Sequence, residues 1–76
     1  MSNAVDIMIH TNTPLSDDQF DAVAHEVQAL EGIVKFNRNT RMPNFIMVEY
    51  NAGQTKALSI LNKVTRLGFE ATLIAA

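Results

Sequence analysis

The chain has 76 residues, of which 47% are apolar and 18% are charged, and it contains no cysteine. That length allows one domain, which buries only about 60% of the surface of its unfolded chain and so folds with little margin. The composition is typical of a globular protein. The lack of cysteine excludes disulfides, thiolate metal sites and a cysteine nucleophile, and the net charge of −2 gives no reason to expect nucleic acid as a partner.

The ends of the chain and its apolar runs carry no membrane or export signal. No apolar run is long enough to cross a bilayer, and no basic stretch precedes an apolar one at the N-terminus. We therefore expect a cytoplasmic location without a membrane partner. Residues 1–4 are expected to be a disordered N-terminus or the remnant of an expression tag, although Met1 leaves a native origin open, and residues 5–76 are expected to form one domain.

The first predicted element is a strand over residues 5–10, where apolar and polar residues alternate. Alternate side chains of a strand lie on opposite faces of its sheet. One set is therefore expected to face the core and the other to face away from it. The first set is Val5, Ile7 and Ile9, and the second is Asp6, Met8 and His10.

A helix is predicted to begin at Ser16. Ser16 and Gln19 have the spacing of a capping box, in which each side chain accepts a hydrogen bond from the backbone N–H of the other residue. Leu15 and Phe20 occupy the two positions of a hydrophobic staple. The aspartates at positions 17 and 18 place negative charge at the positive end of the helix dipole. The helix is expected to end at Gly32, in the left-handed conformation that glycine tolerates.

The second half of the chain predicts two strands, a helix and a last strand. The second strand includes Ile33 and Phe36, and the third covers residues 45–50, with the polar, proline-containing residues 37–44 as their hairpin connection. Thr55 is the predicted N-cap of the second helix, and Gly68 is expected to end that helix. Residues 69–74 form the last predicted strand.

The order β-α-β-β-α-β predicts an α+β, ferredoxin-like sandwich, in which both helices cover one face of a four-stranded antiparallel sheet. Right-handed crossovers place the first and third strands at its centre. The residues expected to be buried between the sheet and the helices include Phe20, Val27, Ile46, Val48, Leu61 and Val64.

Three segments resemble parts of the heavy-metal-associated (HMA) domain, a family of copper chaperones, mercury-binding proteins and domains of metal-pumping ATPases. Residues 30–36 resemble its helix-to-strand glycine turn, residues 47–51 its third strand, and residues 67–71 its closing glycine-aromatic segment. The resemblance implies the same ferredoxin-like fold. It also implies a metal motif, Cys-x-x-Cys, at the start of the first helix, and counting back from Gly32 places the two cysteine positions on Ser16 and Gln19. Neither residue supplies a thiolate, so the resemblance implies a degenerate member whose metal site is lost.

Other side chains could provide a weaker metal site. His10 ends the first strand, and Asp17 and Asp18 open the first helix, so the three could converge near the intervening loop, but they lack a recognisable ligand spacing. His25 lies four residues after Asp21, which favours an exposed helix pair rather than a metal ligand.

Two surface groups are candidates for contact with a partner. Met8, Phe45 and Met47 are expected to form an apolar strip on the sheet face that no helix covers, and such a strip often marks an interface. Coordination of copper by the two methionines is the alternative reading. A basic patch of Lys35, Arg38 and Arg41 is expected around the second strand, either as charge that protects a sheet edge or as a docking site for an acidic partner.

No pair of residues suggests a nucleophile with its base, so we expect no enzyme and no cofactor. The favoured hypothesis is a small interaction or regulatory module that binds a protein partner, or a second copy, through the open sheet face or an edge strand. A metal carrier or sensor with His, Asp or Met ligands is the main alternative. A ligand-binding regulatory domain of the ACT type is the third, although the glycine usual near its first helix is not seen.

Overall fold

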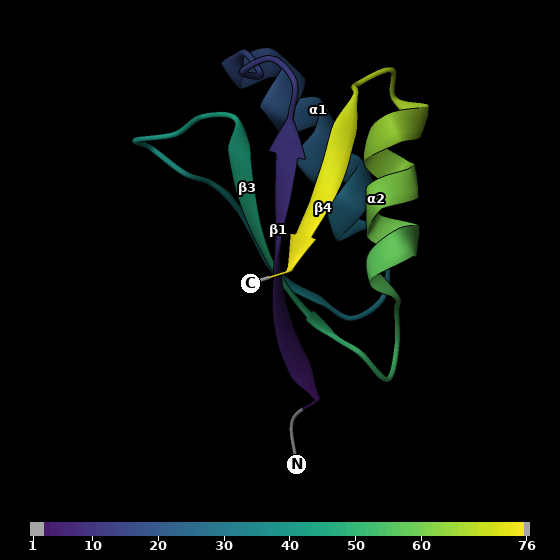
Figure 1. Ribbon diagram of the computed structural model, residues 1–76. Helices are drawn as coiled ribbons and strands as arrows, with labels where there is room; N and C mark the ends of the chain where they lie inside the picture. Colours follow the sequence, from purple (N-terminus) through teal and green to yellow (C-terminus); the bar gives the residue numbers. More distant parts are fainter. Residues whose placement is uncertain (1–2, 76) are drawn as a thin grey trace.

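A computed structural model describes residues 3–75, which form a four-stranded antiparallel sheet with two helices on one face (Figure 1). Strands β1 and β3 are central, because the strands lie in the order β2-β3-β1-β4. This arrangement confirms the ferredoxin-like fold and the central position of the first and third strands. The elements are β1 (Ala4–Thr11), α1 (Asp17–Gln28), β2 (Ile33–Arg38), β3 (Phe45–Asn51), α2 (Ala57–Arg66) and β4 (Ala71–Ala75).

The core lies between the helices and the sheet face that they cover. Apolar side chains that alternate along β1 and β3 meet those at helical spacing on α1 and α2, which is the pattern that the sequence predicts. Of the six residues expected to be buried, Phe20 and Leu61 are half-buried against this core and the other four are buried. The buried apolar side chains are Ile7, Ile9, Leu15, Val23, Val27, Phe36, Ile46, Val48, Tyr50, Ile60 and Val64.

The first strand departs from the prediction at its N-terminal end. Val5 was expected in the core, but 39% of it is exposed. Among the described residues, β4 pairs with residues 7–11 of β1, so Val5 lies at a corner of the sheet that has β3 on one side and no described strand on the other. Asn3 precedes the strand and its carbonyl accepts a hydrogen bond from the N–H of Ala52 at 3.0 Å. The prediction that residues 1–4 are a tag remnant or disordered stays a prediction, and residues 1, 2 and 76 lie outside the described chain.

Both helices have boundaries that differ from the predicted ones. α1 ends at Gln28, not at Gly32, and Gly32 instead turns the chain into β2 with a φ of +87°. Its carbonyl accepts a hydrogen bond from Asn51 at the end of β3, at 2.7 Å. Thr55 is not the N-cap of α2, because the helix begins one residue later than expected, with Lys56 as N-cap. The N–H of Thr55 donates to the Asn51 carbonyl at 3.1 Å, so Thr55 belongs to the turn that follows β3.

The last strand is also shorter at its start than predicted, since β4 begins at Ala71 rather than at residue 69. Gly68, with a φ of +98°, turns the chain after α2 as expected. Neither of the two helices in residues 3–75 has the length and apolar character needed to cross a membrane.

Gly32→Ala is expected to destabilise the fold more than Gly68→Ala does. Both glycines have positive φ, so either alanine costs about 1–2 kcal/mol in backbone strain. A Cβ on Gly32 would also lie 2.8 Å from the Cβ of Gln54, whereas nothing lies within 4 Å of a Cβ on Gly68. Urea unfolding of the two variants measures the difference, and equal losses would contradict a steric role for Gln54.

Candidate functional site at the start of helix α1

The capping box predicted at the start of α1 is present. The N–H of Gln19 donates to the Ser16 hydroxyl oxygen at 3.2 Å, and the N–H of Ser16 donates to the Gln19 side-chain oxygen at 2.9 Å. These two bonds satisfy backbone N–H groups that have no partner within the helix. Both side chains therefore serve the helix terminus, and both offer oxygen atoms rather than soft sulfur ligands.

The side chain of Arg38, on β2, binds the same helix terminus. Arg38 donates from Nη1 to the carbonyl of Leu15 at 2.9 Å and from Nη2 to the Asp17 carboxylate at 2.5 Å. Its guanidinium carbon lies 5.0 Å from the ring centroid of Phe20. Phe20 in turn stacks on Phe36 of β2, with ring centroids 5.5 Å apart. Arg38 and these rings therefore join β2 to the first turn of α1.

The end of β1 and the loop after it are hydrogen-bonded to the residues that precede β3 and β4. Thr11 is buried, its N–H donates to the carbonyl of Asn44 at 2.8 Å, and its own carbonyl accepts from the Asn44 side-chain amide at 3.0 Å. Asn12 donates its N–H to the carbonyl of Glu70 at 3.0 Å and its side-chain amide to the Glu70 carboxylate. These bonds restrict the position from which the chain enters the helix.

A cavity of about 400 Å³ lies beside this loop, where it meets the connection from α2 to β4. Its size is at the lower end of the range for small-molecule sites. Among the described residues that line it, Glu70 is the one ionisable group, and its carboxylate is already hydrogen-bonded to Asn12. The lining residues are Thr11, Asn12, Thr13, Leu15, Gly68, Phe69 and Glu70.

The weak metal candidates do not converge. His10 lies on the sheet face opposite to the helices, with its ring centroid 4.8 Å from that of Phe45. Asp17 lies at the helix layer, bound to Arg38, and Asp18 is exposed in the same first turn. His25 is exposed in the last turn of α1. Within residues 3–75, no three or more of the His, Asp and Glu residues are grouped so that they could hold a metal ion.

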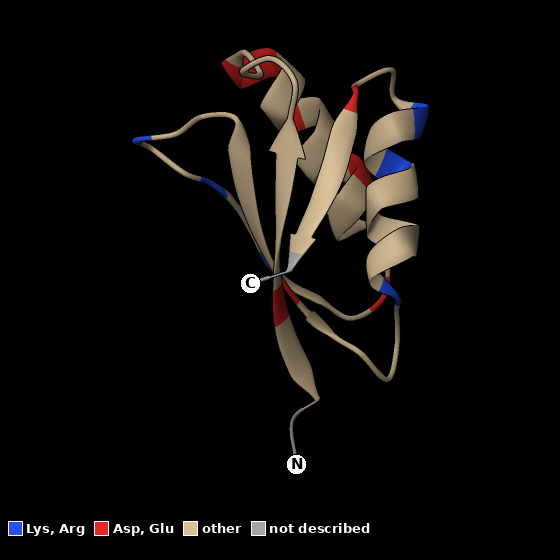
Figure 2. Ribbon diagram, in the orientation of Figure 1, with Lys and Arg blue, Asp and Glu red and all other residues tan. Residues whose placement is uncertain are grey.

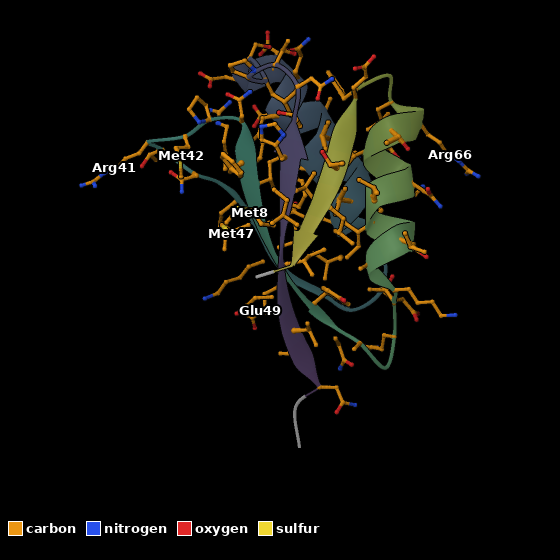
Figure 3. All side chains as sticks on the ribbon, in the orientation of Figure 1. Met8, Arg41, Met42, Met47, Glu49 and Arg66 are labelled. Atoms are coloured by element: carbon orange, nitrogen blue, oxygen red, sulfur yellow. The ribbon has the colours of Figure 1, made fainter. Side chains whose placement is uncertain are left out.

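The uncovered sheet face brings together the three residues of the predicted apolar strip. Met8 and Met47 are direct partners across β1 and β3, and His10 and Phe45 form the next outward-facing pair. Figure 3 shows both methionines on the side of the sheet away from the helices. All four side chains are half-buried. The role of this strip as an interface stays a prediction.

The three residues of the predicted basic patch have different surroundings. Lys35 is aligned with Glu49 on the uncovered face, whereas Arg38 lies on the helix side and is bound to Leu15 and Asp17. Arg41 is exposed in the hairpin between β2 and β3, and Figure 2 shows the basic colour on this hairpin. The role of Arg38 at the helix start was missed by the sequence analysis. Its position two residues after the buried Phe36 was the available signal, because such residues share a face of the strand.

Arg38→Met is expected to lower the free energy of unfolding by about 1–2 kcal/mol, because it leaves the Leu15 carbonyl without its charged donor. Asp17→Asn is expected to cost less than about 1 kcal/mol, since the Asp17 side chain is 88% exposed. Arg66→Met, on the exposed last turn of α2, is the matched control and should change stability by at most about 0.5 kcal/mol. A greater loss from Asp17→Asn than from Arg38→Met in urea unfolding would contradict this ranking.

No protein-family model and no curated protein sequence matches the chain. Solved structures do match it over nearly its whole length. A copper-binding domain from HMA7, a P-type ATPase, aligns with a TM-score of 0.81 at 18% identity, covering 93% of this chain and 95% of that one. The N-terminal domain of a potential copper-translocating P-type ATPase from Bacillus subtilis, in its Cu(I)-loaded state, aligns with a TM-score of 0.82 at 16% identity, covering 92% and 86%.

Oxidized MerP from Ralstonia metallidurans gives a TM-score of 0.78 at 10% identity, covering 92% of this chain and 96% of that one. Identities this low show a shared fold and nothing more. The chain therefore has the fold of these three proteins.

Proposed function

We propose that this chain is a non-enzymatic interaction or regulatory module built on the HMA fold, with the thiolate metal site of that fold lost. The observation that carries the proposal is the capping box. Ser16 and Gln19 occupy the positions where the resemblance places the two cysteines, and their side chains bind the backbone of the helix start instead. A soft ion such as Cu(I) prefers thiolate or thioether ligands, and hydroxyl and amide oxygens are poor substitutes.

The surroundings of the capping box support a structural role for the helix start. Arg38 fixes it from β2, and Thr11 and Asn12 tie the preceding loop to Asn44 and Glu70. A site that must open to exchange a metal ion would gain nothing from these bonds. A stable module with a fixed surface does gain from them, because a domain of this size has little other margin.

The uncovered sheet face is the part of the proposed module that contacts a protein partner. The alternative contact is pairing along an edge strand. β2 is one edge, and its register shifts between Ile33 and Lys35, with the intervening Val34 exposed. Such a bulge disrupts the row of hydrogen-bonding groups that another strand would need. This irregularity favours the sheet face over the β2 edge, in a protein that we place in the cytoplasm.

One observation favours the second candidate, a metal carrier with other ligands. Met8 and Met47 are direct cross-strand partners, which places their Cβ atoms about 4.5–5.5 Å apart. Thioethers suit soft ions, and His10 lies two residues along β1 from Met8 on the same face. Two thioethers and an imidazole packed on Phe45 make a weaker set than a pair of thiolates, so this candidate ranks second.

The unmodified protein is expected not to compete with a Cu(I) chelator of ordinary strength, whereas Ser16→Cys combined with Gln19→Cys should create competition. The new thiols would lie among the backbone N–H groups of a helix start, which lower a thiol pKa. A matched control pair, Asn62→Cys with Thr65→Cys, has the same spacing on exposed positions in the second half of α2. It should bind more weakly because it lacks those N–H groups.

Two further variants separate the candidate functions in the same assay. Ser16→Ala should lower stability by about 1 kcal/mol through the lost cap without changing copper binding. Met47→Leu keeps the apolar surface but removes a thioether. Tight Cu(I) binding by the unmodified protein would overturn the lost-site proposal, and its loss in Met47→Leu would establish the second candidate. A folded double-cysteine protein that does not bind would refute the placement of Ser16 and Gln19.

A further inference from the structure

Strand β4 is an edge of the sheet, and no strand in residues 3–75 pairs with its outer side. The N–H of Asn12 donates to the carbonyl of Glu70 at 3.0 Å, and the register of this pair continues into β4. Along an antiparallel strand, the backbone groups of successive residues point alternately to one side and the other. Counting on from Glu70, every second residue therefore binds β1, and the residues between them point their N–H and C=O groups outward. The outward-pointing residues are Ala71, Leu73 and Ala75.

The outer edge of β4 lacks the features that commonly keep edge strands from pairing, which are charged side chains, proline and β-bulges. The sequence of β4, Ala-Thr-Leu-Ile-Ala, contains no charged residue and no proline. Its register with β1 shows no shift over the described residues. The opposite edge, β2, has a register shift and also carries Lys35 and Arg38. Of the two edges, β4 is therefore the one suited to pairing with a further strand.

An uncharged flank of α2 borders the same edge. α2 packs on β4, and Figure 1 shows α1 behind both of them. The charged side of α2 faces α1, because Lys63 lies 4.0 Å from Glu26. Leu58, Leu61 and Thr65 lie at helical spacing on the opposite side. Leu61 is half-buried, but Leu58 is 66% exposed, more than any other large apolar side chain in the described chain.

We infer that a second copy of the chain pairs with this edge, with the two β4 strands antiparallel about a two-fold axis at Leu73. The pairing joins two four-stranded sheets into one continuous sheet. Leu73 then faces Leu73 of the second copy, and Ala71 faces Ala75. Each outward-pointing residue therefore belongs to a pair that exchanges two hydrogen bonds. Such a contact is isologous, because both copies use the same surface.

The flank of α2 favours a second copy over an isolated peptide strand. A peptide that adds to β4 would bind the backbone groups but would leave Leu58 exposed to water. The two-fold axis of an antiparallel pair is perpendicular to the sheet, so a second copy brings its own α2 to the same face. Leu58 and Leu61 of each copy then lie toward the flank of the other. Both flanks are uncharged, so identical surfaces meet there without like-charge repulsion.

On the strands, the nearest like charges across this contact are Glu70 and Asp6 of the second copy. Glu70 lies one residue beyond the Ala71–Ala75 pair, and the register places Asp6 two strands away from it. Two strand spacings are about 9.6 Å, which is close to one Debye length at 0.1 M salt. The repulsion is therefore largely screened, and the dimer should tighten slightly as salt is raised.

The contact is small, and its size sets the expected strength of the dimer. The five residues of β4 span about 17 Å, and a sheet with one helix layer is roughly 20 Å thick. Each copy therefore contributes on the order of 350 Å², whereas a standard interface buries about 800 Å² on each partner. We expect a weak dimer that is half-formed between about 10 μM and about 1 mM.

This inference goes beyond the proposed function, because the β4 edge is separate from the uncovered sheet face. Sedimentation equilibrium of the full chain over that concentration range tests the association. We expect a monomer–dimer equilibrium that Leu58→Lys weakens by about tenfold or more, because it places the same charge on both copies at the contact. Val34→Lys makes a matched change at an exposed apolar position on the opposite edge, and should alter the dissociation constant by less than about threefold. Met47→Lys, on the uncovered face, should also leave the dimer intact.

Amide hydrogen exchange identifies the strand that pairs. At low protein concentration, the outward N–H of Leu73 should exchange rapidly, whereas the N–H groups of Thr72 and Ile74, which point to β1, should exchange slowly. At high concentration the Leu73 N–H should become protected in proportion to the dimer, and the other two should stay protected. This alternation is specific to pairing along the outer edge of β4.

Ala71→Pro tests the hydrogen bonds of the edge directly. It removes one outward N–H at the first residue of the strand, where proline is tolerated. The loss occurs twice in a two-fold dimer, so Ala71→Pro should weaken the dimer by about fivefold or more. Circular dichroism of each variant confirms that it is folded.

A monomer at every concentration would overturn the inference and leave the β4 edge to an extended segment of a different protein. A dimer in which the Leu73 N–H stays unprotected would also overturn it, as would equal weakening by Leu58→Lys and Val34→Lys. Loss of the dimer in a folded Met47→Lys protein would move the association to the uncovered face. The Cu(I) competition assay reads out the lost metal site independently, so failure of the proposed function is distinguishable from failure of this inference.

Discussion

The start of α1 depends on a simple constraint, because the first N–H groups of a helix have no partner within it. Ser16 and Gln19 satisfy two of them through the capping box. Arg38 of β2 contacts the Leu15 carbonyl and the Phe20 ring, and these contacts join the capped helix start to the sheet. The direction in which α1 leaves the sheet, and hence the layer of side chains it contributes to the core, follows from these contacts.

Side chains alternate along the two central strands, so the residues that form the core differ from those that form the uncovered face. On β1 and β3, one set of side chains is buried under the helices, and the other set forms the uncovered face with Met8 and Met47 at its centre. A substitution on that face leaves the covered core unchanged. The proposed function requires that the metal site at the start of α1 be lost and that the uncovered sheet face bind a partner. Both changes are compatible with the same fold.

Sequence reasoning succeeded where the signal was local. The capping box and the left-handed glycines are set by a few neighbouring residues, and the alternation on β3 is set by burial on one side of a strand. It failed where distant parts of the chain decide. The described part of β4 pairs with β1 only from Ile7 onward, which leaves Val5 exposed. Thr55 lies in a turn closed on the Asn51 carbonyl, and the surroundings of Arg38 depend on how β2 packs on α1. The cavity beside Glu70 likewise forms only when two loops meet in the folded chain.

The proposed function requires that the start of α1 be a structural cap rather than a metal site. The most direct test is a titration of isotopically labelled protein with Cu(I) under reducing, oxygen-free conditions, followed by the backbone amide signals of residues 12–20. We predict that the Ser16 and Gln19 amide signals stay in place at stoichiometric Cu(I), because both groups remain bound to each other. Saturable shifts of these two signals at one equivalent of Cu(I) would contradict the claim.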